Sequence, residues 1–229
     1  MVTGWRTETE IIDLMNKDFH CSKIEQKFPV KLGNAAGGLV EGVPLVCGSK
    51  ACFTLKKSGA NWVWKEDLSN SLNQVGSYSG STVFKNSLVV AGGWGPGYLA
   101  SVEIVKPYVK TILASKGLPV AMYSPCVVPW DADRYLVIGG ESWGQKIRKE
   151  THFMDMQGNT SPGPNLNIAR YYFACHEVVL NNEAFIIVTG GSTNEAFKTT
   201  EYLSKSTPYE WIKGRKILNG FLMTYVHKK

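Results

Sequence analysis

A short apolar segment that ends in glycine recurs along the chain and organises it. Three copies end in a glycine pair, at residues 88–93, 135–140 and 186–191, and two weaker copies lie at residues 1–4 and 45–48. The first glycines are Gly4, Gly48, Gly92, Gly139 and Gly190, so successive copies are 44, 44, 47 and 51 residues apart. A near-constant period of this length is the sequence signature of a repeat architecture.

Each period contains the patterns of four short strands. A strand with small residues precedes the glycine copies, at residues 36–40, 79–83, 124–128 and 173–179. Polar pairs such as Lys85-Asn86 join it to the glycine-ending strand, and such residues accept the backbone conformations of a hairpin. A third strand follows, and then a more polar fourth strand that often carries tryptophan, as at Trp64 and Trp211. Four antiparallel strands per period, without a long helical pattern, predict an all-β propeller.

The clearest period resembles the kelch repeat. It runs from the Asn-Ile-Ala-Arg segment at residues 167–170, through Gly190-Gly191 and Glu201, to Trp211. The resemblance extends over nearly the whole chain, although the copies at Gly4 and Gly48 lack a second glycine and only Arg170 clearly matches the kelch arginine. It implies a kelch-type β-propeller of four-stranded antiparallel blades.

The count of repeats indicates an incomplete ring. We expect residues 1–229 to form a single, incomplete propeller domain with four full blades and partial blade strands at both ends. Residues 219–226 have the pattern of another blade's first strand. Kelch rings usually have six or seven blades, so the resemblance implies an internal fragment of a longer protein. The alternative is that the two ends combine into one blade of a five-bladed ring.

The five cysteines bear on the compartment. Cys126 and Cys175 occupy equivalent points on adjacent inner strands, and Cys47 and Cys52 flank a short turn, so either pair can form a disulfide or remain as free thiols. Cys21 could compete for either partner. The chain is similar to the cysteine-containing secreted kelch proteins of arthropods and other invertebrates. Those proteins carry cysteines at the places in the repeat where this chain has Cys21, Cys47 and Cys52. Because disulfides need an oxidising environment, we expect an extracellular protein, with a cytoplasmic one as the alternative.

Composition and charge exclude two classes of partner. The net charge of +6 comes from scattered basic residues, whereas a nucleic-acid reader would concentrate them in a stripe. There is no run of 18 apolar residues, so we expect no membrane span. Asn159-Thr160-Ser161 forms a glycosylation sequon in a polar loop.

Motifs for catalysis and metal binding are missing from the sequence. It has no Cys-x2-Cys pair and no closely spaced histidine pair, so we expect no zinc. Kelch-like copper radical oxidases of the galactose-oxidase type need two histidines and two tyrosines, one of them cross-linked to cysteine. The four histidines, His20, His152, His176 and His227, do not stand beside such a Tyr–Cys pair. No Gly-x-Ser-x-Gly motif is present either, so we expect neither an enzyme nor a cofactor.

The loops that follow the glycine pairs carry the candidate binding residues. These are Trp5, Arg6, Trp94, Tyr98, Trp143 and Lys146. Trp, Tyr and Arg are enriched at binding hot spots, and the kelch resemblance implies that these loops emerge on one partner-binding face. The alternative is that the aromatic rings only pack between neighbouring loops. We expect a non-enzymatic scaffold that recognises a protein or a glycan; the alternatives are a propeller enzyme of the galactose-oxidase type and the substrate-adaptor fragment of a cytosolic kelch protein.

Overall fold

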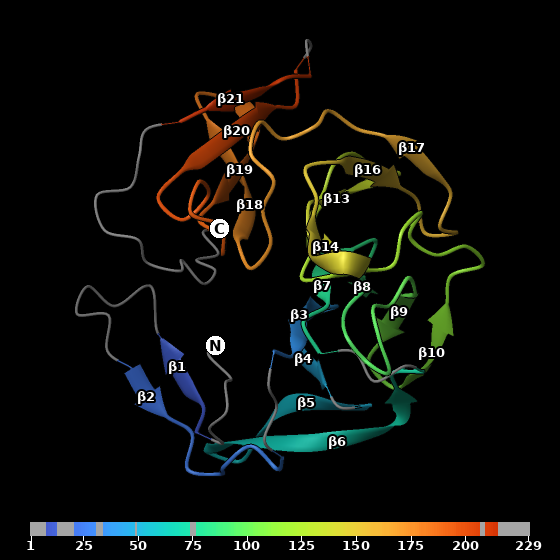
Figure 1. Cartoon of the computed structure of the whole chain (residues 1–229). Coiled ribbons are helices and arrows are strands. Elements are labelled where there is room, and N and C mark those ends of the chain that lie inside the picture. Colours follow the sequence, from blue (N-terminus) through green and yellow to red (C-terminus); the bar gives the residue numbers. More distant parts are fainter. Residues whose placement is uncertain are drawn as a thin grey trace.

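Antiparallel four-stranded sheets make up most of the molecule. The computed structural model describes residues 8–12, 21–30, 34–48, 50–73, 77–206 and 209–214, with the backbone alone for residues 11, 12 and 21. Four of the sheets, which we call blades 1 to 4, are arranged around a common centre (Figure 1). The glycine period therefore led to the correct fold class, an all-β propeller arrangement.

Each blade uses four strands in sequence order, with the first strand innermost. Blade 1 consists of β3 (Ala36–Val40), β4 (Val43–Gly48), β5 (Ala51–Ser58) and β6 (Asn61–Ser71). Blade 2 consists of β7 (Gly80–Phe84), β8 (Ser87–Ala91), β9 (Val102–Lys106) and β10 (Val109–Leu113). Blade 3 consists of β12 (Cys126–Pro129), β13 (Tyr135–Ile138), β16 (Thr151–Met154) and β17 (Thr160–Pro162). Blade 4 consists of β18 (Ala174–Leu180), β19 (Glu183–Thr189), β20 (Thr200–Ser204) and β21 (Trp211–Lys213).

Two smaller sheets accompany the blades. Near the N-terminus, β1 (Glu10–Ile12) pairs with β2 (Cys21–Lys23), as expected of a partial blade, and Thr9 accepts a hydrogen bond from the Trp64 indole of blade 1 at 3.1 Å. A three-stranded sheet joins β11 (Met122–Tyr123), β14 (Glu141–Ser142) and β15 (Lys146–Ile147), with a 3-10 turn at Trp143–Gln145. The glycine copy at residues 1–4 and the strand expected at 219–226 lie outside the described residues.

The hairpin between the two inner strands follows from its turn residues. Lys85 and Asn86 have φ values of 46° and 55°, and Asn181 and Asn182 have 50° and 63°. Two consecutive residues with positive φ form the turn that matches the twist of two antiparallel strands. After the second strand the chain turns again at a glycine pair; Gly93, with φ of 114°, has a conformation that L side chains rarely adopt.

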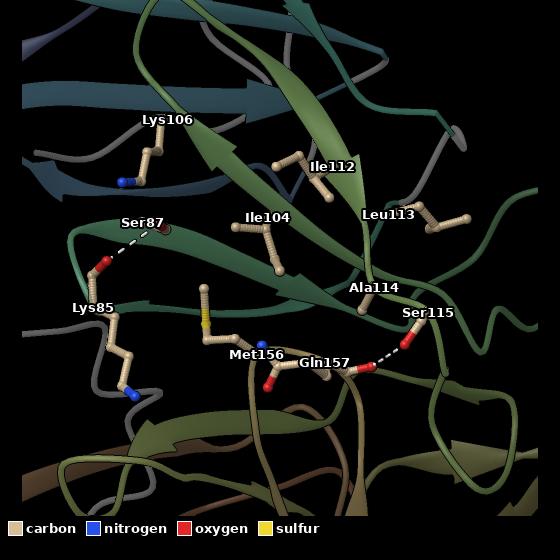
Figure 2. A pocket seen from close by; sticks show the side chains of 10 residues that line it. All are labelled: Lys85, Ser87, Ile104, Lys106, Ile112, Leu113, Ala114, Ser115, Met156 and Gln157. Carbon is tan, nitrogen blue, oxygen red and sulfur yellow. Dashed lines mark hydrogen bonds between the residues drawn. The ribbon is translucent and has the colours of Figure 1, made fainter.

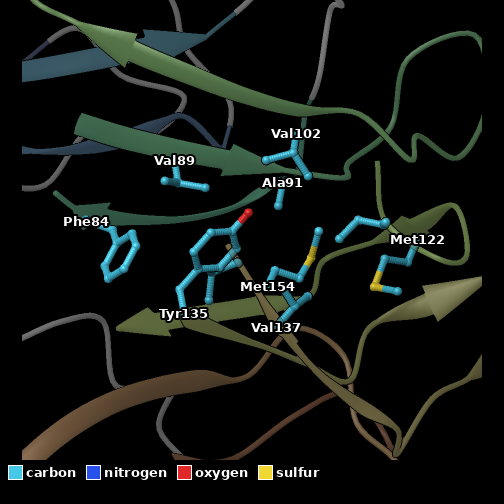
Figure 3. Close-up of a cluster of buried hydrophobic side chains, with 10 residues drawn as sticks. Phe84, Val89, Ala91, Val102, Met122, Tyr135, Val137 and Met154 are labelled. Atoms are coloured by element: carbon cyan, nitrogen blue, oxygen red, sulfur yellow. The ribbon is translucent and has the colours of Figure 1, made fainter. Parts of the chain in front are cut away.

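The core lies in the seams between neighbouring blades, and each seam has its own apolar cluster. Between blades 2 and 3, Phe84 and Val89 meet Tyr135, Val137 and Met154 (Figure 3). Between blades 3 and 4, Leu136 and Ile138 pack with Ile186, Val188 and Trp211.

Blade 1 has an apolar cluster on each side. It meets blade 2 through Leu45, Leu88, Val90 and Val105. Phe28, Phe53 and Trp64 fill the side that faces the N-terminal hairpin. Burial of these side chains is what holds the blades in a fixed order around the centre.

Candidate functional site

Loops from blades 2 and 3 meet at one end of the central strands. The loop after Gly93 folds back, because Trp94 forms bridges with Ser77 before β7 and with Tyr98 further along the same loop. The loop after Gly140 forms β14, the 3-10 turn and β15. The sequence prediction that glycine pairs release such loops is correct for both blades.

Tyr98 links these two loops. Its hydroxyl donates a hydrogen bond to the Glu141 Oε1 atom at 2.6 Å, across the boundary between the blades. Its ring lies 5.1 Å, centroid to centroid, from Trp94 of its own loop and 5.1 Å from Trp143 of the other loop. Three of the candidate residues, Trp94, Tyr98 and Trp143, are therefore brought together in one place.

A second set of rings extends this group towards the inner strands. Tyr123 lies 4.9 Å from Tyr78 and 5.2 Å from Tyr172, and Tyr172 lies 5.0 Å from Tyr171. Tyr98 and Tyr123 connect the two sets at 6.2 Å. We call the seven rings together the aromatic surface: Tyr78, Trp94, Tyr98, Tyr123, Trp143, Tyr171 and Tyr172.

The segments that precede the inner strands hold the tyrosines in a repeated geometry. Tyr78, Ser124 and Tyr172 each stand two residues before an inner strand and each has a left-handed backbone, with φ of 59°, 52° and 52°. The Ser124 amide donates to the Tyr78 carbonyl at 2.8 Å, and the Tyr172 amide donates to the Ser124 hydroxyl at 3.1 Å. Asn34 of blade 1 has the same conformation two residues before β3, with φ of 53°, so this geometry is a repeated feature of the entry to each blade.

Part of the surface packs internally and part is open to solvent. The side of Trp143 lies on Gly97, where an added Cβ atom would come within 3.2 Å of the indole ring. Trp143 is nevertheless 68% exposed and Trp94 is 43% exposed, whereas the five tyrosines are half-buried. The tyrosines therefore support the two tryptophans, which remain available to a partner.

Both central phenols stay protonated at neutral pH. The hydrogen bond to Glu141, with burial and the nearby negative charge, raises the pKa of Tyr98 to about 12. Burial, with a smaller effect of neighbouring groups, raises the pKa of Tyr123 to about 12 as well. The surface therefore presents neutral rings and hydroxyl groups around one carboxylate.

The remaining candidate residues lie elsewhere. Lys146 is exposed on β15, opposite Ser142, and so borders the surface on the blade 3 side. Trp5 and Arg6 lie outside the described residues. The sequence search missed Tyr78, Tyr123, Tyr171, Tyr172 and Glu141. Alignment of the segments before the inner strands of blades 2, 3 and 4 would have revealed the tyrosines, which recur two or three residues before those three strands.

The two proposed cysteine pairs form disulfides. Cys47 and Cys52 are directly opposite each other on β4 and β5, with Cα atoms 4.0 Å apart. Cys126 and Cys175 join the inner strands of blades 3 and 4, with Cα atoms 6.1 Å apart. The sequon residue Asn159 is exposed in the turn before β17, where its side chain donates to Asp155 at 2.8 Å; the other two sequon residues begin β17 instead of extending the loop.

The histidines do not form a metal site within the described part of the chain. His152 lies on β16 and His176 on β18, and burial lowers the pKa of His152, which favours the neutral imidazole. Among residues whose placement is described, no three His, Cys, Asp or Glu side chains are grouped so as to hold a metal ion. His20 and His227 are not described.

The fold and the loop surface define a propeller-type β protein. No protein-family model matches the chain, and no curated protein matches it. Among solved structures 149 chains match. One, titled "Structure of YjhT", is similar with a TM-score of 0.72 over 94% of this chain and 79% of that chain, at 13% sequence identity. That likeness shows the fold. No described helix is long and apolar enough to cross a membrane.

Proposed function

We propose that this protein is a non-enzymatic scaffold of the kelch type that binds a partner protein through the aromatic surface. The observation that carries the proposal is the pair of exposed tryptophans, Trp94 and Trp143, fixed on either side of Tyr98. Large apolar rings rarely stay in water without a role when they are grouped, and tryptophan and tyrosine dominate binding hot spots.

The residues that hold Trp94 and Trp143 in place favour a role in recognition. Tyr98 is held by Glu141, and neighbouring rings contact one another at centroid distances of 5.1 Å. A surface that is already ordered loses little conformational entropy when a partner arrives. Because the rings touch, a partner meets a continuous surface rather than a slot between rings, and this arrangement suits a protein segment better than a single sugar.

Two further observations support the rest of the proposal. The rigid ring of blades leaves its loops free to vary, which suits recognition. The two disulfides favour an extracellular setting, because such bonds persist under oxidising conditions.

The test is a comparison of matched tryptophan variants. Trp94→Ala and Trp143→Ala would be compared with Trp62→Ala, because Trp62 is 39% exposed but lies on β6 of blade 1, outside the loops. Proteins selected from a displayed extracellular library on the immobilised chain would be measured against each variant by biolayer interferometry. We expect each loop variant to weaken binding by about 2 kcal/mol, a factor of about thirty, and Trp62→Ala to have no effect.

Other results would overturn parts of the proposal. Equal loss with all three variants would mean that the aromatic surface is not the site. Binding on a glycan array, with no protein recovered, would make the partner a glycan. Stoichiometric copper or iron in the purified protein would contradict a non-enzymatic role.

A further inference from the structure

Among the described residues, one of the three seams between full blades is left open at its outer end. Between blades 1 and 2, the Asp67 carboxylate accepts the Tyr108 amide at 2.6 Å, and the Tyr108 hydroxyl donates to Thr54 at 3.0 Å. Between blades 3 and 4, Trp130 packs against Phe153 at 5.0 Å and Tyr209 at 5.2 Å. Between blades 2 and 3 the outer end is a groove of about 480 Å³ (Figure 2).

The walls of this groove are apolar and continuous with the core. Ile104 of β9 and its cross-strand partner Ile112 of β10 form one wall, and Met156, from the β16–β17 turn, faces them. Ala114 and Met156 also pack against the buried cluster of this seam. Ile112 is 59% exposed and Leu113 is 50% exposed, so the apolar wall reaches the surface.

Two lysines line one end of the groove. Lys85 and Lys106 both line it; Figure 2 shows both in its left half, away from Leu113 and Ser115, with their amino groups pointing apart. Lys85 pairs with Asp133, whose side chain is 84% exposed, and Lys106 pairs with Glu41 at 3.8 Å. Such exposed pairs are weak, so a carboxylate brought by a ligand can replace either partner.

The opposite end of the groove is closed. The Ser115 hydroxyl donates to the Gln157 carbonyl at 2.8 Å, and the Lys116 amide donates to the same carbonyl at 3.2 Å. Along the groove runs β10, the outermost strand of its sheet. An edge strand offers backbone hydrogen bonds to an extended chain laid beside it.

We propose that this groove is a second binding site, and that it takes an extended peptide segment in which an acidic residue stands next to apolar residues. The carboxylate pairs with the ammonium group of one of the two lysines, Lys85 or Lys106, and the apolar side chains cover Ile104, Ile112 and Met156. The volume is within the range of ligand sites, about 300–1,000 Å³. The charge of the lysines and the edge of β10 favour a peptide over an uncharged small molecule.

The experiment uses a phage-displayed library of random peptides selected on the whole protein. Recovered peptides would be fluorescein-labelled and measured by fluorescence polarisation on the wild type and on variants. Ile112→Glu is matched by Ile212→Glu, because Ile212 is 47% exposed on β21 of blade 4, away from the groove. Circular dichroism and thermal melting would establish that each variant folds.

We expect the recovered peptides to carry Asp or Glu beside apolar residues. Ile112→Glu, and the double variant Lys85→Ala/Lys106→Ala, should each weaken binding about tenfold or more, whereas Ile212→Glu should not. The affinity should also fall as salt is added, because the lysines are exposed. Trp143→Ala should leave this binding unchanged, which separates it from binding at the aromatic surface.

Three outcomes would overturn the proposal. The first is the recovery of no peptide, or of peptides without an acidic residue. The second is equal binding by wild type and Ile112→Glu. The third is competition by dodecanoate that no acidic peptide matches, which would make the ligand an anionic amphiphile.

Discussion

Tyr98 is the residue on which the two loops of the aromatic surface depend. Its hydrogen bond to Glu141 exists only while the phenol carries its proton. The phenol titrates near pH 10 in an unfolded chain, but the pKa in the folded protein is about 12. The contribution of Tyr98 to stability is therefore complete below about pH 10 and is lost as the pH rises through about 12.

This difference predicts the alkaline behaviour of Tyr98→Phe. The variant lacks the titrating phenol, so its free energy of unfolding should fall less steeply than that of the wild type between about pH 10 and 12. Urea denaturation at several pH values would measure the slopes. Parallel slopes would show that the Glu141 contact does not favour the protonated phenol.

The Tyr135 hydroxyl, unlike that of Tyr98, should lower the stability of the folded protein. Its side chain is fully buried in the seam between blades 2 and 3, and its hydroxyl has no hydrogen-bond partner among the described residues (Figure 3). A buried hydroxyl without a partner costs free energy, so Tyr135→Phe should raise the stability by about 1 kcal/mol. Chemical denaturation would measure the change. A destabilised variant would indicate that the hydroxyl has a partner such as a buried water.

At the scale of the element, blade 4 is held by a buried ion pair. Arg170, which precedes β18, donates to the Glu201 carboxylate of β20 at 2.7 Å and to the Gly190 carbonyl at 2.7 Å. Both charged side chains are fully buried. Glu201 also accepts the Asn167 amide at 2.7 Å, so one carboxylate ties the entry of the blade to its third strand.

Removing one member of this pair should be costly. Arg170→Met leaves Glu201 buried without its counter-charge and should lower the free energy of unfolding by about 3 kcal/mol or more. The double variant Arg170→Met/Glu201→Met should recover part of that loss. If the losses of free energy of unfolding measured for the single variants Arg170→Met and Glu201→Met simply add in the double variant, the two residues are not energetically coupled.

The third-strand residue equivalent to Glu201 differs between alternate blades. Blade 2 repeats the asparagine–glutamate contact of blade 4, because Glu103 accepts the Asn73 amide at 2.6 Å. In the third strands of blades 1 and 3 the corresponding residues are Phe53 and His152, and the residues equivalent to the asparagines are Pro29 and Pro119. Proline has no amide hydrogen to donate, so a glutamate at these positions would lack its partner.

Sequence patterns did not predict the extent of a strand whose residues bond to the neighbouring blade. The sequence placed the fourth strand of blade 1 at Trp64, and β6 extends well beyond that residue, from Asn61 to Ser71. Asp67 and Asn70 are buried there because they bond the Tyr108 amide and the Lys106 carbonyl of blade 2. No reading of a single segment could find those partners. Strand positions within the glycine period, by contrast, depend on turns that the segment itself encodes.

At the scale of the whole molecule, the two disulfides should differ in their effect on stability. Cys126 and Cys175 are 49 residues apart, whereas Cys47 and Cys52 are 5 apart. In the chain-entropy model, the longer loop restricts the unfolded state more, by about 4 kcal/mol against about 2 kcal/mol.

The corresponding double alanine variants test this difference. Cys126→Ala/Cys175→Ala should lose about twice the stability of Cys47→Ala/Cys52→Ala, as measured by guanidinium unfolding. Equal losses would mean that strain or packing, and not loop closure, sets the contribution of these bonds.

The disulfide between Cys126 and Cys175 also determines whether proteolysis in blade 3 separates the molecule into two pieces. The exposed turns at residues 131–133 and around Asn159 both lie inside the segment that this bond closes. A cut in either turn leaves both pieces covalently joined at the inner strands, where the apolar seam continues to hold them together. A clipped molecule would therefore travel as one species until a reductant reaches it. Outside the cell, damage to blade 3 need not release a fragment.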